Sequence, residues 1–460
     1  MRPRRRLRRP SSNRARLSVD SQKRQYLCID LKSFYASVEC VERGLDPMAA
    51  RLVVADPERS EKTICLAVSP AMKELGVRNR CRVFEIPKDL DYVMAAPRMA
   101  LYIERSADIY AIYLKYLAPE DIHVYSIDEA FMDATDYLGL YGCTTRELGE
   151  RIRADVRAAT GIPASCGIGP NLYLAKIALD IAAKHSPDSF GELDEEGYRQ
   201  HLWGHRPLTD FWRIGEGTAR RLARMGIRTM GELAMAPEEP LYREFGIDAE
   251  ILIDHAWGIE PVRMEHIKAY RSETHSLSSA QVLAHDYRFD DALTVAKEMA
   301  DGVALDLVRK GKLASSISLW VGYAMTEQAR IQARADGGRG AWFRAIESAG
   351  GTHRFPTPTN SREAIYQAAI ELFEAHIDRE RLIRRMTVNA GNIVDEGASG
   401  IQLDLLSDGK RLSSERRRQE AVAAVKARFG NNAVLKGIDL LPEATARARN
   451  RQIGGHRSGV

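Results

Sequence analysis

Three acidic residues beside two short apolar segments are the first candidates for chemistry in this sequence. Asp30 follows the segment Tyr26–Ile29, and the pair Asp128 and Glu129 follows His123–Ile127. Short apolar runs of this length are typical of β-strands, so each acid is predicted to stand at the end of a strand. Acids at strand ends are commonly turn formers without a catalytic role, and that interpretation stays open at this point.

A shared position for the three carboxylates would have a chemical consequence. If the two strands are neighbours, the acids meet at one edge of a sheet, where protonation or bound cations relieve their repulsion. Hard carboxylate oxygens suit Mg²⁺, which keeps some waters and takes further ligands from substrate phosphates. Two such ions activate an attacking hydroxyl and stabilise a leaving pyrophosphate. The acids therefore predict nucleotidyl transfer.

The elements that must position these acids lie in the first part of the chain. Residues 25–185 alternate apolar strands (YLCID, LVVAD, VYSID) with helical patterns, which indicates an α/β or α+β unit. Residues 186–262 are predicted to be helical and are punctuated by glycines. The charged stretch 265–276 is predicted to be a linker.

The second part of the chain is mixed again from about Lys268. Strands are predicted in SSISLWVGY and MTVNAGNIV, a helix in SREAIYQAAIELFEAHI, and a long loop in the glycine-rich segment 335–351. Residues 408–460 are predicted to form a polar tail with one amphipathic helix, which has Val422, Val425 and Phe429 on one face.

Composition bounds the class of protein. With 460 residues, 45% of them hydrophobic and 28% charged, the chain is expected to form several folded domains. No apolar run approaches the roughly 20 residues of a membrane helix, and the start MRPRRRLRRPSS has no apolar core behind it, so a cytoplasmic protein is expected. The cysteines lack the close spacing of zinc or redox motifs and are interpreted as buried thiols: Cys28, Cys40, Cys65, Cys81, Cys143 and Cys166.

Charge is unevenly distributed. The net charge is +4, yet residues 1–16 contain eight arginines and no acid, which leaves −4 for the remainder. Residues 1–24 are predicted to be a disordered basic arm, either a nucleic-acid or address tag or a merely solvated terminus. His201 and His205 have a helical spacing that could indicate zinc, but a third and fourth ligand are missing.

Three blocks of sequence, in this order, resemble the signature motifs of Y-family DNA polymerases: DLKSFYASVE (30–39), SIDEA (126–130) and GIGPNLYLAKIA (167–178). The resemblance extends from about residue 25 to the C-terminus. It implies a multidomain α+β protein, a right-hand polymerase with a ferredoxin-like palm, small fingers, a helical thumb and an α/β little finger. The implied ranges are palm 25–33 and 95–185, fingers 34–94, thumb 186–262 and little finger 268–396.

The resemblance also implies roles in the catalytic centre. In that family the first aspartate, the carbonyl of the next residue and the Asp-Glu pair hold two Mg²⁺ ions, which here gives Asp30, Leu31, Asp128 and Glu129. The aromatic residue five positions after the first aspartate excludes the ribose 2′-hydroxyl by simple sterics, and here it is Tyr35. Its neighbour Phe34 is grouped with the nucleotide-binding residues, although core packing is the favoured interpretation for Phe34 and the disfavoured one for Tyr35.

Three further residues are implied contacts of the incoming triphosphate. Lys176, on a predicted helix, would supply a point charge to the γ-phosphate, while a lysine that shares a helical face with Asp180 can also be a solvated ion-pair partner. Ser69 and Lys73 lie in the segment that contacts the triphosphate in relatives. Pro70 stands where many members have tyrosine and Lys73 where many have arginine, a usage that resembles the bacterial UmuC-like subgroup.

Contacts to primer-template DNA are implied in two places. A helix-hairpin-helix is expected at about 210–233, where Gly215 and Gly217 would let backbone N–H groups approach a phosphate at a helix N-terminus and so hold the duplex without reading its sequence. A glycine turn between helices is also common without any ligand. In the little finger, two interpretations stay open for Arg381, Arg384 and Arg385. They contact DNA phosphates, or they lie at a merely solvated helix end.

A partner is implied by the segment 402–406, which resembles the pentapeptide that docks bacterial polymerases into the sliding clamp, the β subunit. Such peptides bury apolar anchors in a groove, and the position just after the last domain favours this function over a chance match. The segment consists of Gln402, Leu403, Asp404, Leu405 and Leu406.

The sequence thus predicts a monomeric, template-directed, low-fidelity DNA polymerase that adds dNMP from dNTP to a primer 3′-hydroxyl in translesion synthesis. We find no carboxylate constellation suited to a proofreading exonuclease. One alternative is a non-catalytic adaptor that binds DNA and clamp, which would be expected to lose the metal carboxylates. A nucleotidyl cyclase on a similar palm is a more distant one, and the hairpin, little finger and clamp peptide argue against it.

Overall fold

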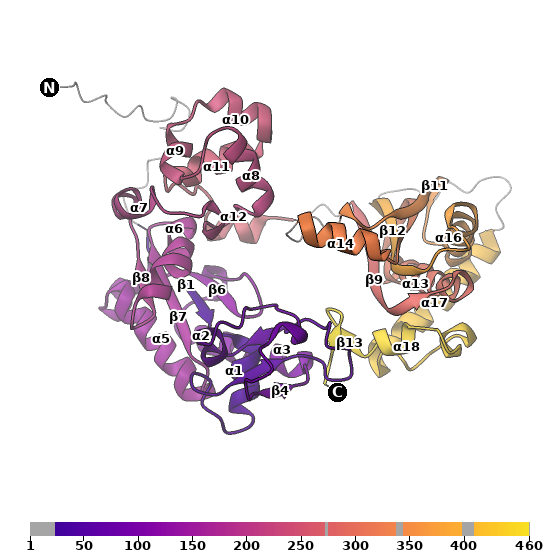
Figure 1. Ribbon diagram of the computed structural model, residues 1–460, viewed down its shortest axis with the longest axis horizontal. Coiled ribbons are helices and arrows are strands. Elements are labelled where there is room, and N and C mark those ends of the chain that lie inside the picture. The colour runs from indigo at the N-terminus through magenta and orange to yellow at the C-terminus, as the bar shows by residue number, and fades with distance from the viewer. Residues whose placement is uncertain (1–23, 272–274, 337–343, 398–408, 460) are drawn as a thin grey trace. The chain divides into compact units, whose positions relative to one another are not determined.

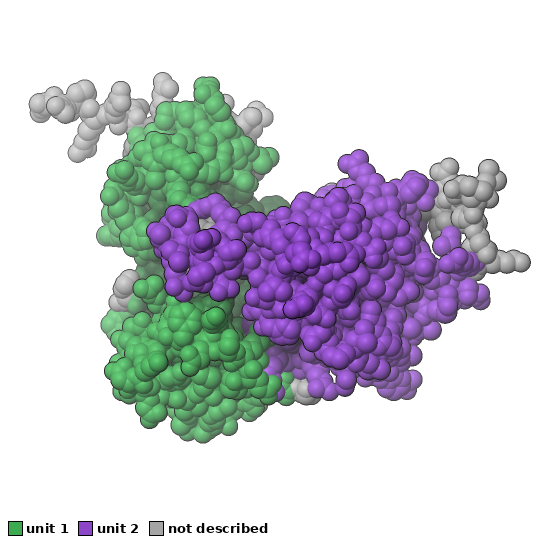
Figure 2. All heavy atoms as spheres, turned by 45° about the vertical axis from the view of Figure 1, so that its right-hand side comes forward, with its two compact units in different colours: residues 1–270, 459 green, residues 271–458, 460 purple. Residues whose placement is uncertain are grey.

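The computed structural model describes residues 24–271, 275–336, 344–397 and 409–459. The chain divides into two units at the boundary between Tyr270 and Arg271, with Gly459 assigned to the first unit (Figures 1 and 2). Within the described residues, no helix combines the length and apolar character that crossing a bilayer requires.

The first unit is built on a five-stranded sheet with strand order β5-β6-β1-β7-β8 (Figure 1). The central strand β1 pairs antiparallel with β6 and β7, and β7 pairs parallel with β8. The strands are β1 (Tyr26–Leu31), β5 (Ile122–Val124), β6 (Glu129–Asp133), β7 (Ala164–Gly169) and β8 (Phe190–Glu192). The almost continuous apolar run of β1 is explained by this central place, because nearly all of its residues are buried.

Helices cover both faces of this sheet. On one face, a side chain at Gly149 of α5 would contact Cys166 of β7. On the other face, α6 approaches so closely that a Cβ on Gly167 would stand 2.2 Å from the carbonyl oxygen of Ala175, so only glycine fits there. The helices of this part are α3 (Met99–Tyr113), α4 (Tyr137–Tyr141), α5 (Thr145–Thr160) and α6 (Leu172–Ile177), which continues as a π-helical turn (Ala178–Ala182) and a 3₁₀ turn (Ala183–His185).

A smaller sheet with order β3-β2-β4 carries the segment between the first acid and α3. It has its own buried cluster, which includes Val53, Val68 and Met72. Its elements are α1 (Phe34–Val41), β2 (Leu52–Val54), β3 (Ala67–Val68), α2 (Pro70–Glu74), a 3₁₀ turn (Val83–Glu85) and β4 (Val93–Ala95).

The helical part of the first unit surrounds a separate core to which Tyr198, Phe211 and Leu222 belong. Its elements are α7 (Glu195–Leu202), a 3₁₀ turn (Leu208–Asp210), α8 (Glu216–Arg224), α9 (Met230–Met235), α10 (Glu238–Phe245), α11 (Asp248–Ala256) and α12 (Met264–Ala269). Between α8 and α9 the chain turns at Gly226 with φ of 81°, a conformation that glycine adopts without strain. A helical hairpin is therefore present in the region where the sequence predicted one.

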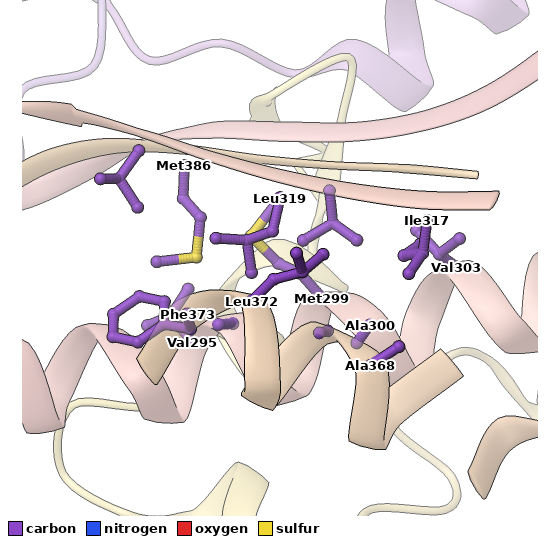
Figure 3. Close-up of a cluster of buried hydrophobic side chains, with 14 of the residues drawn as sticks. Val295, Met299, Ala300, Val303, Ile317, Leu319, Ala368, Leu372, Phe373 and Met386 are labelled. Atoms are coloured by element: carbon purple, nitrogen blue, oxygen red, sulfur yellow. The ribbon is translucent and has the colours of Figure 1, made fainter. Parts of the chain in front are cut away.

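The second unit contains a four-stranded antiparallel sheet with order β11-β10-β12-β9. Its strands are β9 (Ser276–Tyr287), β10 (Lys312–Tyr323), β11 (Ser348–Thr359) and β12 (Ile383–Asp395). The helices α13 (Phe289–Arg309) and α16 (Arg362–His376) pack on one face. Figure 3 shows Ile317, Leu319 and Met386 pointing from the strands toward the helix residues Val295, Met299, Leu372 and Phe373, which form the buried core of this unit.

Several local predictions in the second half were wrong. The predicted linker 265–276 contains most of α12 and the start of β9, and the predicted glycine-rich loop ends inside β11. The tail contains, besides α17 (Gly409–Phe429), a 3₁₀ turn (Gly437–Leu440), a second helix α18 (Ala446–Arg449) and the hairpin β13 (Gln452–Ile453) and β14 (His456–Arg457). The predicted apolar face of α17 is not its buried face, because Val425 is 37% and Phe429 65% exposed.

Candidate active site

The strand that contains Asp30 and the strand that begins with Glu129, β1 and β6, are direct neighbours, whereas β5, where the sequence predicted the strand 123–127, pairs with β6 and not with β1. In the antiparallel pairing of β1 with β6, Asp30 stands opposite Glu129. Next to this pair, the N–H of Leu31 donates to the carbonyl oxygen of Asp128 at 2.9 Å. The backbone therefore brings the three acids and Leu31 to one end of the β1–β6 pair, as the sequence predicted.

One detail of that prediction was wrong: Asp128 and Glu129 do not close a strand. The strand β5 ends at Val124, the chain reverses through residues 125–128, and Glu129 is the first residue of β6. The reversal is held by the N–H groups of Tyr125 and Ser126, which both donate to the carbonyl oxygen of Glu129, at 2.9 and 3.1 Å. Asp128 is therefore the last residue of a hairpin turn.

Side-chain hydrogen bonds fix this turn. The Ser126 hydroxyl donates to Oδ1 of Asp128 at 2.5 Å. From α3, the Ser106 hydroxyl donates to the carbonyl oxygen of Ile127 at 2.6 Å. The position of the Asp128 carboxylate thus depends on contacts that reach beyond the turn itself.

The carboxylates influence one another's ionisation. Burial, and then the charges of Asp128 and Glu129, raise the pKa of Asp30 to about 7, while Lys176 acts in the opposite direction. Burial also raises the pKa of Glu129, although its contacts with Lys176 and Cys28 lower it in part. The site therefore carries more negative charge than its surroundings compensate, which protonation or cations would relieve.

Lys176 is the internal cation of this cluster. Its Nζ lies 2.8 Å from Oε2 of Glu129 and 3.1 Å from Oδ1 of Asp180, and its side chain is only 9% exposed. Burial lowers the pKa of Lys176, but Asp180, Cys28 and Glu129 together raise it above its ordinary value, so the amine is charged at neutral pH. The structure thus gives Lys176 a buried ion pair in place of a solvated one.

The donor set fits a divalent cation in chemistry, because three mutually repelling carboxylates offer the hard oxygen ligands that Mg²⁺ prefers. The Glu129 carboxylate is turned to Lys176 and accepts from the thiol of Cys28 at 3.3 Å. Across the described ranges, no three acidic, histidine or cysteine side chains are arranged as a ready ligand set. Binding of a cation between Asp30, Asp128 and Glu129 would require the last of these to leave its partners.

The aromatic residues of α1 occupy two different environments. Phe34 is 2% exposed and belongs to the core. Tyr35 is partly exposed, and its ring stacks on that of Tyr102 at a centroid distance of 4.5 Å and an interplanar angle of 16°. Burial and then the charge of Asp128 raise the pKa of Tyr35, which indicates that its phenol lies within electrostatic reach of the acids.

A buried carboxylate supports the stacked pair. Glu39, also in α1, is fully buried and accepts from the Tyr102 hydroxyl at 2.7 Å. Arg98 donates to both oxygens of Glu39, from Nε at 2.9 Å and from Nη2 at 2.8 Å, and Arg43 is its third partner. Sequence reasoning placed Glu39 in a motif but assigned it no role, and it did not find Tyr102. The available signal in the sequence was one acid within the otherwise uncharged helix segment FYASVECV.

Two of the predicted triphosphate contacts lie on or next to α2. Lys73 donates to the hydroxyl of Ser33 at 2.8 Å. Burial lowers the pKa of Lys73 and the charge of Asp30 opposes this effect, so Lys73 lies near the acids. Ser69 precedes the helix, is fully buried, and accepts from the N–H of Leu52 at 3.1 Å. The hydroxyl of Ser69 thus joins α2 to the small sheet.

The predicted DNA contacts are spread over both units. Gly215 caps α8 at its N-terminus and Gly217 lies in its first turn, and a Cβ on either would meet no atom within 4 Å. In the second unit, Arg381 is paired with Glu347 at 2.7 Å and Arg384 donates to the carbonyl of Ala284 at 3.1 Å.

The remaining predicted sites have different outcomes. Arg385 lines a cavity of about 230 Å³ together with Trp320 and Thr387. The predicted clamp peptide, 402–406, lies outside the described residues. His205 pairs with Asp210 at 2.8 Å, and the pair contributes to no metal-binding group in the described part of the chain.

Comparison with known proteins identifies two matched regions. Residues 29–180 match the model of the impB/mucB/samB family, and residues 274–405 match that of its C-terminal domain. Among curated proteins, the chain is 31% identical to the Bacillus subtilis (strain 168) protein UvrX, described as a UV-damage repair protein, over 95% of this chain and 98% of that one. It is 30% identical to "DNA polymerase IV 2" of the same organism, over 93% and 97% of the two chains.

Among solved structures, a Y-family DNA polymerase chimera has a similar fold, with a TM-score of 0.58 and 22% sequence identity. The match covers 81% of this chain and 99% of the chimera.

Proposed function

This chain belongs to the impB/mucB/samB family and is a DNA-directed DNA polymerase of the translesion type, and from that premise we propose that Asp30, Asp128 and Glu129 form its catalytic centre. The observation that carries the proposal is the β1–β6 register, which sets Asp30 opposite Glu129 and ties Leu31 to Asp128. The main-chain oxygen of Leu31 completes the proposed ligands. Two Mg²⁺ ions held there would activate the primer 3′-hydroxyl and stabilise the leaving pyrophosphate.

Lys176 has two roles in this proposal. Without substrate it neutralises Glu129 and Asp180, which lowers the energetic cost of holding buried carboxylates close together. With a bound nucleotide, the same amine becomes a donor to the triphosphate. Lys73 is the second proposed triphosphate contact, and Ser69 contributes by fixing the start of α2, which carries Lys73.

Tyr35 is the proposed discriminator between deoxyribose and ribose. Its ring is held by the stack on Tyr102, and a fixed ring beneath the sugar leaves no room for a 2′-hydroxyl. Phe34 contributes to this site through the core, because its side chain is buried.

The surrounding parts of the chain would hold primer-template DNA. We assign the palm to 25–33 and 95–185, the fingers to 34–94, the thumb to 186–262 and the little finger to 268–396. Gly215 and Gly217 offer an unobstructed helix N-terminus to a phosphate, and Arg385 lies on the sheet of the second unit beside Trp320. Arg381 and Arg384 would have to leave their partners, Glu347 and Asp286, to bind phosphate.

Further proposals concern partners and location. The segment 402–406 would dock the enzyme on the β sliding clamp, and the enzyme would act as a cytoplasmic monomer. Replacing Leu405 and Leu406 by alanine should abolish stimulation of primer extension by the clamp and leave clamp-free extension unchanged. Equal stimulation of both proteins would contradict the docking role.

Primer extension on a templated substrate tests the catalytic centre. The variant Asp128→Asn keeps the shape of the side chain and removes its charge, and it should lower single-nucleotide insertion by about 100-fold or more, as loss of one preorganised electrostatic group does. DNA binding should be retained, because Asp128 is not a proposed DNA contact. Full activity of Asp128→Asn would refute the assignment. A wild-type chain that binds DNA but extends no primer would favour the adaptor.

A further inference from the structure

Trp212 joins the two cores of the first unit. Its half-buried side chain packs against the core of the helical part, which includes Phe211 and Leu222. It also packs against the cluster on the main sheet, to which Tyr26 and Phe131 belong. Trp212 therefore packs the helical part against the sheet, so that a shift of one would displace the other.

On the sheet side, Trp212 contacts the residue that begins the Asp128 turn. Its Nε1–H donates to the Tyr125 hydroxyl at 3.1 Å, and the two rings meet edge to face at 5.8 Å and 81°. Phe131 of β6 completes the group, with its ring 5.9 Å from Trp212 and 5.7 Å from Tyr125. Edge-to-face pairs of this kind are favourable beyond the area they bury.

On the helical side, Trp212 stacks on His255 of α11, with centroids 6.1 Å apart and an interplanar angle of 16°. His255 is itself fixed: it is 3% exposed, its ring stacks on Tyr173 at 3.9 Å, and its Nε2 lies 3.0 Å from Glu260. The helical end of the connection is therefore buried and held by a ring stack and a polar contact.

The turn needs such support. Tyr125 is 46% exposed and Val124 48% exposed, and β5 is an edge strand of the sheet. Hydrogen bonds from Ser106 and Leu31 hold Ile127 and Asp128 at the end of the turn, whereas the exposed start of the turn at a sheet edge has fewer side-chain contacts to hold its geometry. The ring of Tyr125, which contacts both Trp212 and Phe131, restrains the same four-residue turn that ends in Asp128.

We propose that Trp212 is a positioning residue, which holds the Tyr125–Asp128 turn so that the Asp128 carboxylate stays in place for cation binding. This inference rests on the proposed role of Asp128. Trp212 itself does not contact the acids. Its loss would let the turn move, and displacements of about 1 Å in such a site can cost 100-fold in rate.

The test compares two tryptophans with similar surroundings. Trp203 is also half-buried beside the helical core, donates from Nε1 to the carbonyl of Ala256 at 2.8 Å, and meets Trp257 edge to face. These partners belong to the helical part and not to the turn. Trp212→Leu should lower kcat for single-nucleotide insertion by about 10- to 100-fold, raise the Mg²⁺ concentration for half-maximal rate, and change the Kd for DNA less than about threefold. Trp203→Leu should leave kcat of the folded fraction and the Mg²⁺ dependence unchanged.

Two measurements need no turnover. Amide hydrogen exchange at residues 125–128 should accelerate in Trp212→Leu and not in Trp203→Leu. Calorimetric titration of Mn²⁺ into the nucleotide-free protein should show weaker binding only in Trp212→Leu. If Trp212→Leu does not fold, two milder variants give the same test, with smaller shifts expected in both. Trp212→Phe keeps an aromatic ring and loses the Nε1–H, and Tyr125→Phe loses the hydroxyl that accepts from it.

The outcomes separate the two proposals. If Asp128→Asn is inactive while Trp212→Leu or its substitutes keep wild-type Mg²⁺ dependence and exchange, the positioning role is refuted and the catalytic centre stands. Equal shifts in the Trp203 variant also refute it, because they would reflect the helical core alone. If Asp128→Asn remains active, the catalytic centre itself fails, whatever the tryptophan variants show.

Discussion

Glu39 offers the sharpest test of how the ring of Tyr35, the proposed discriminator between deoxyribose and ribose, is held. The substitution Glu39→Gln removes the charge of a fully buried side chain and replaces one of the two oxygens that accept from Arg98, Arg43 and Tyr102 with an amide donor. Breaking a buried pair from one side costs about 3–5 kcal/mol. Because the two arginine side chains are each 35% exposed and water screens part of the interaction, we expect about 3 kcal/mol.

The effect should extend to sugar selection. With a weaker hydrogen bond from its hydroxyl to residue 39, Tyr102 would hold the ring of Tyr35 less firmly. A stacked aromatic pair of this kind contributes about 0.5–1.5 kcal/mol of interaction free energy. Losing that contribution corresponds to a reduction of about 2- to 10-fold in the ratio of kcat/KM for dNTP over rNTP. Tyr102→Phe, which removes only the hydroxyl, should produce the same change at a smaller loss of stability.

The assay is single-nucleotide insertion with matched dNTP and rNTP, together with thermal denaturation. Glu42→Gln is the control, because Glu42 follows the same helix but pairs with Arg105 at the surface, where an ion pair contributes at most about 1 kcal/mol. An unchanged sugar ratio in both Glu39→Gln and Tyr102→Phe would refute the connection from Glu39 to Tyr35, even if the first variant were destabilised.

Three further predictions concern charges. The pKa of Asp30 is raised from 3.8 to about 7, so the metal-free protein should lose stability as the pH rises from about 4 to 7. Asp30→Asn should flatten this pH dependence of the unfolding free energy, measured by denaturant melts. An unchanged pH dependence in Asp30→Asn would contradict the prediction. Lys176→Met leaves Glu129 without its buried lysine partner, so we expect the free energy of unfolding to fall by about 3 kcal/mol and nucleotide insertion to slow. A variant as stable as wild type would show that this ion pair does not stabilise the fold. Glu298 of α13 is buried and accepts from the two N–H groups at the start of α18. Glu298→Ala should therefore lower the free energy of unfolding by about 1–3 kcal/mol and accelerate amide exchange in α18. Unchanged exchange would show that other contacts hold that helix.

The proximity of the three acids along the backbone could be predicted because each acid lies next to a short apolar segment. Asp30 ends an apolar run, and it stands opposite Glu129 in the pairing of β1 with β6. The turn at 125–128 was missed because VYSI has strand-like residues, and the reversal depends on bonds to Glu129 and from Ser106 that no local pattern reveals. Long-range contacts also explain why Tyr102 and Trp212 were not found.

The strand β11 shows the same limit in the fold. Its glycines and prolines locally favour a loop, yet it pairs along β10 as an edge strand, where proline is tolerated. At Gly350 a Cβ would stand 2.1 Å from the carbonyl oxygen of Leu319, so the glycine that suggested a loop is required by the close approach of the neighbouring strand. The glycine at position 350 was correctly recognised as a special backbone position, but it is required by the close approach of β10 and not by a loop.

The charge balance of the centre connects these observations to substrate binding. Lys176 is shared between Glu129 and Asp180, and burial together with the remaining negative charge raises the pKa of Asp30 to about 7. A triphosphate without cations would add negative charge to this cluster and be repelled. Divalent cations relieve both the carboxylates and the phosphates, so each should strengthen binding of the other by the same factor. Nucleotide affinity should therefore fall steeply when divalent cations are removed, and Asp30→Asn, which carries one charge less, should reduce that dependence.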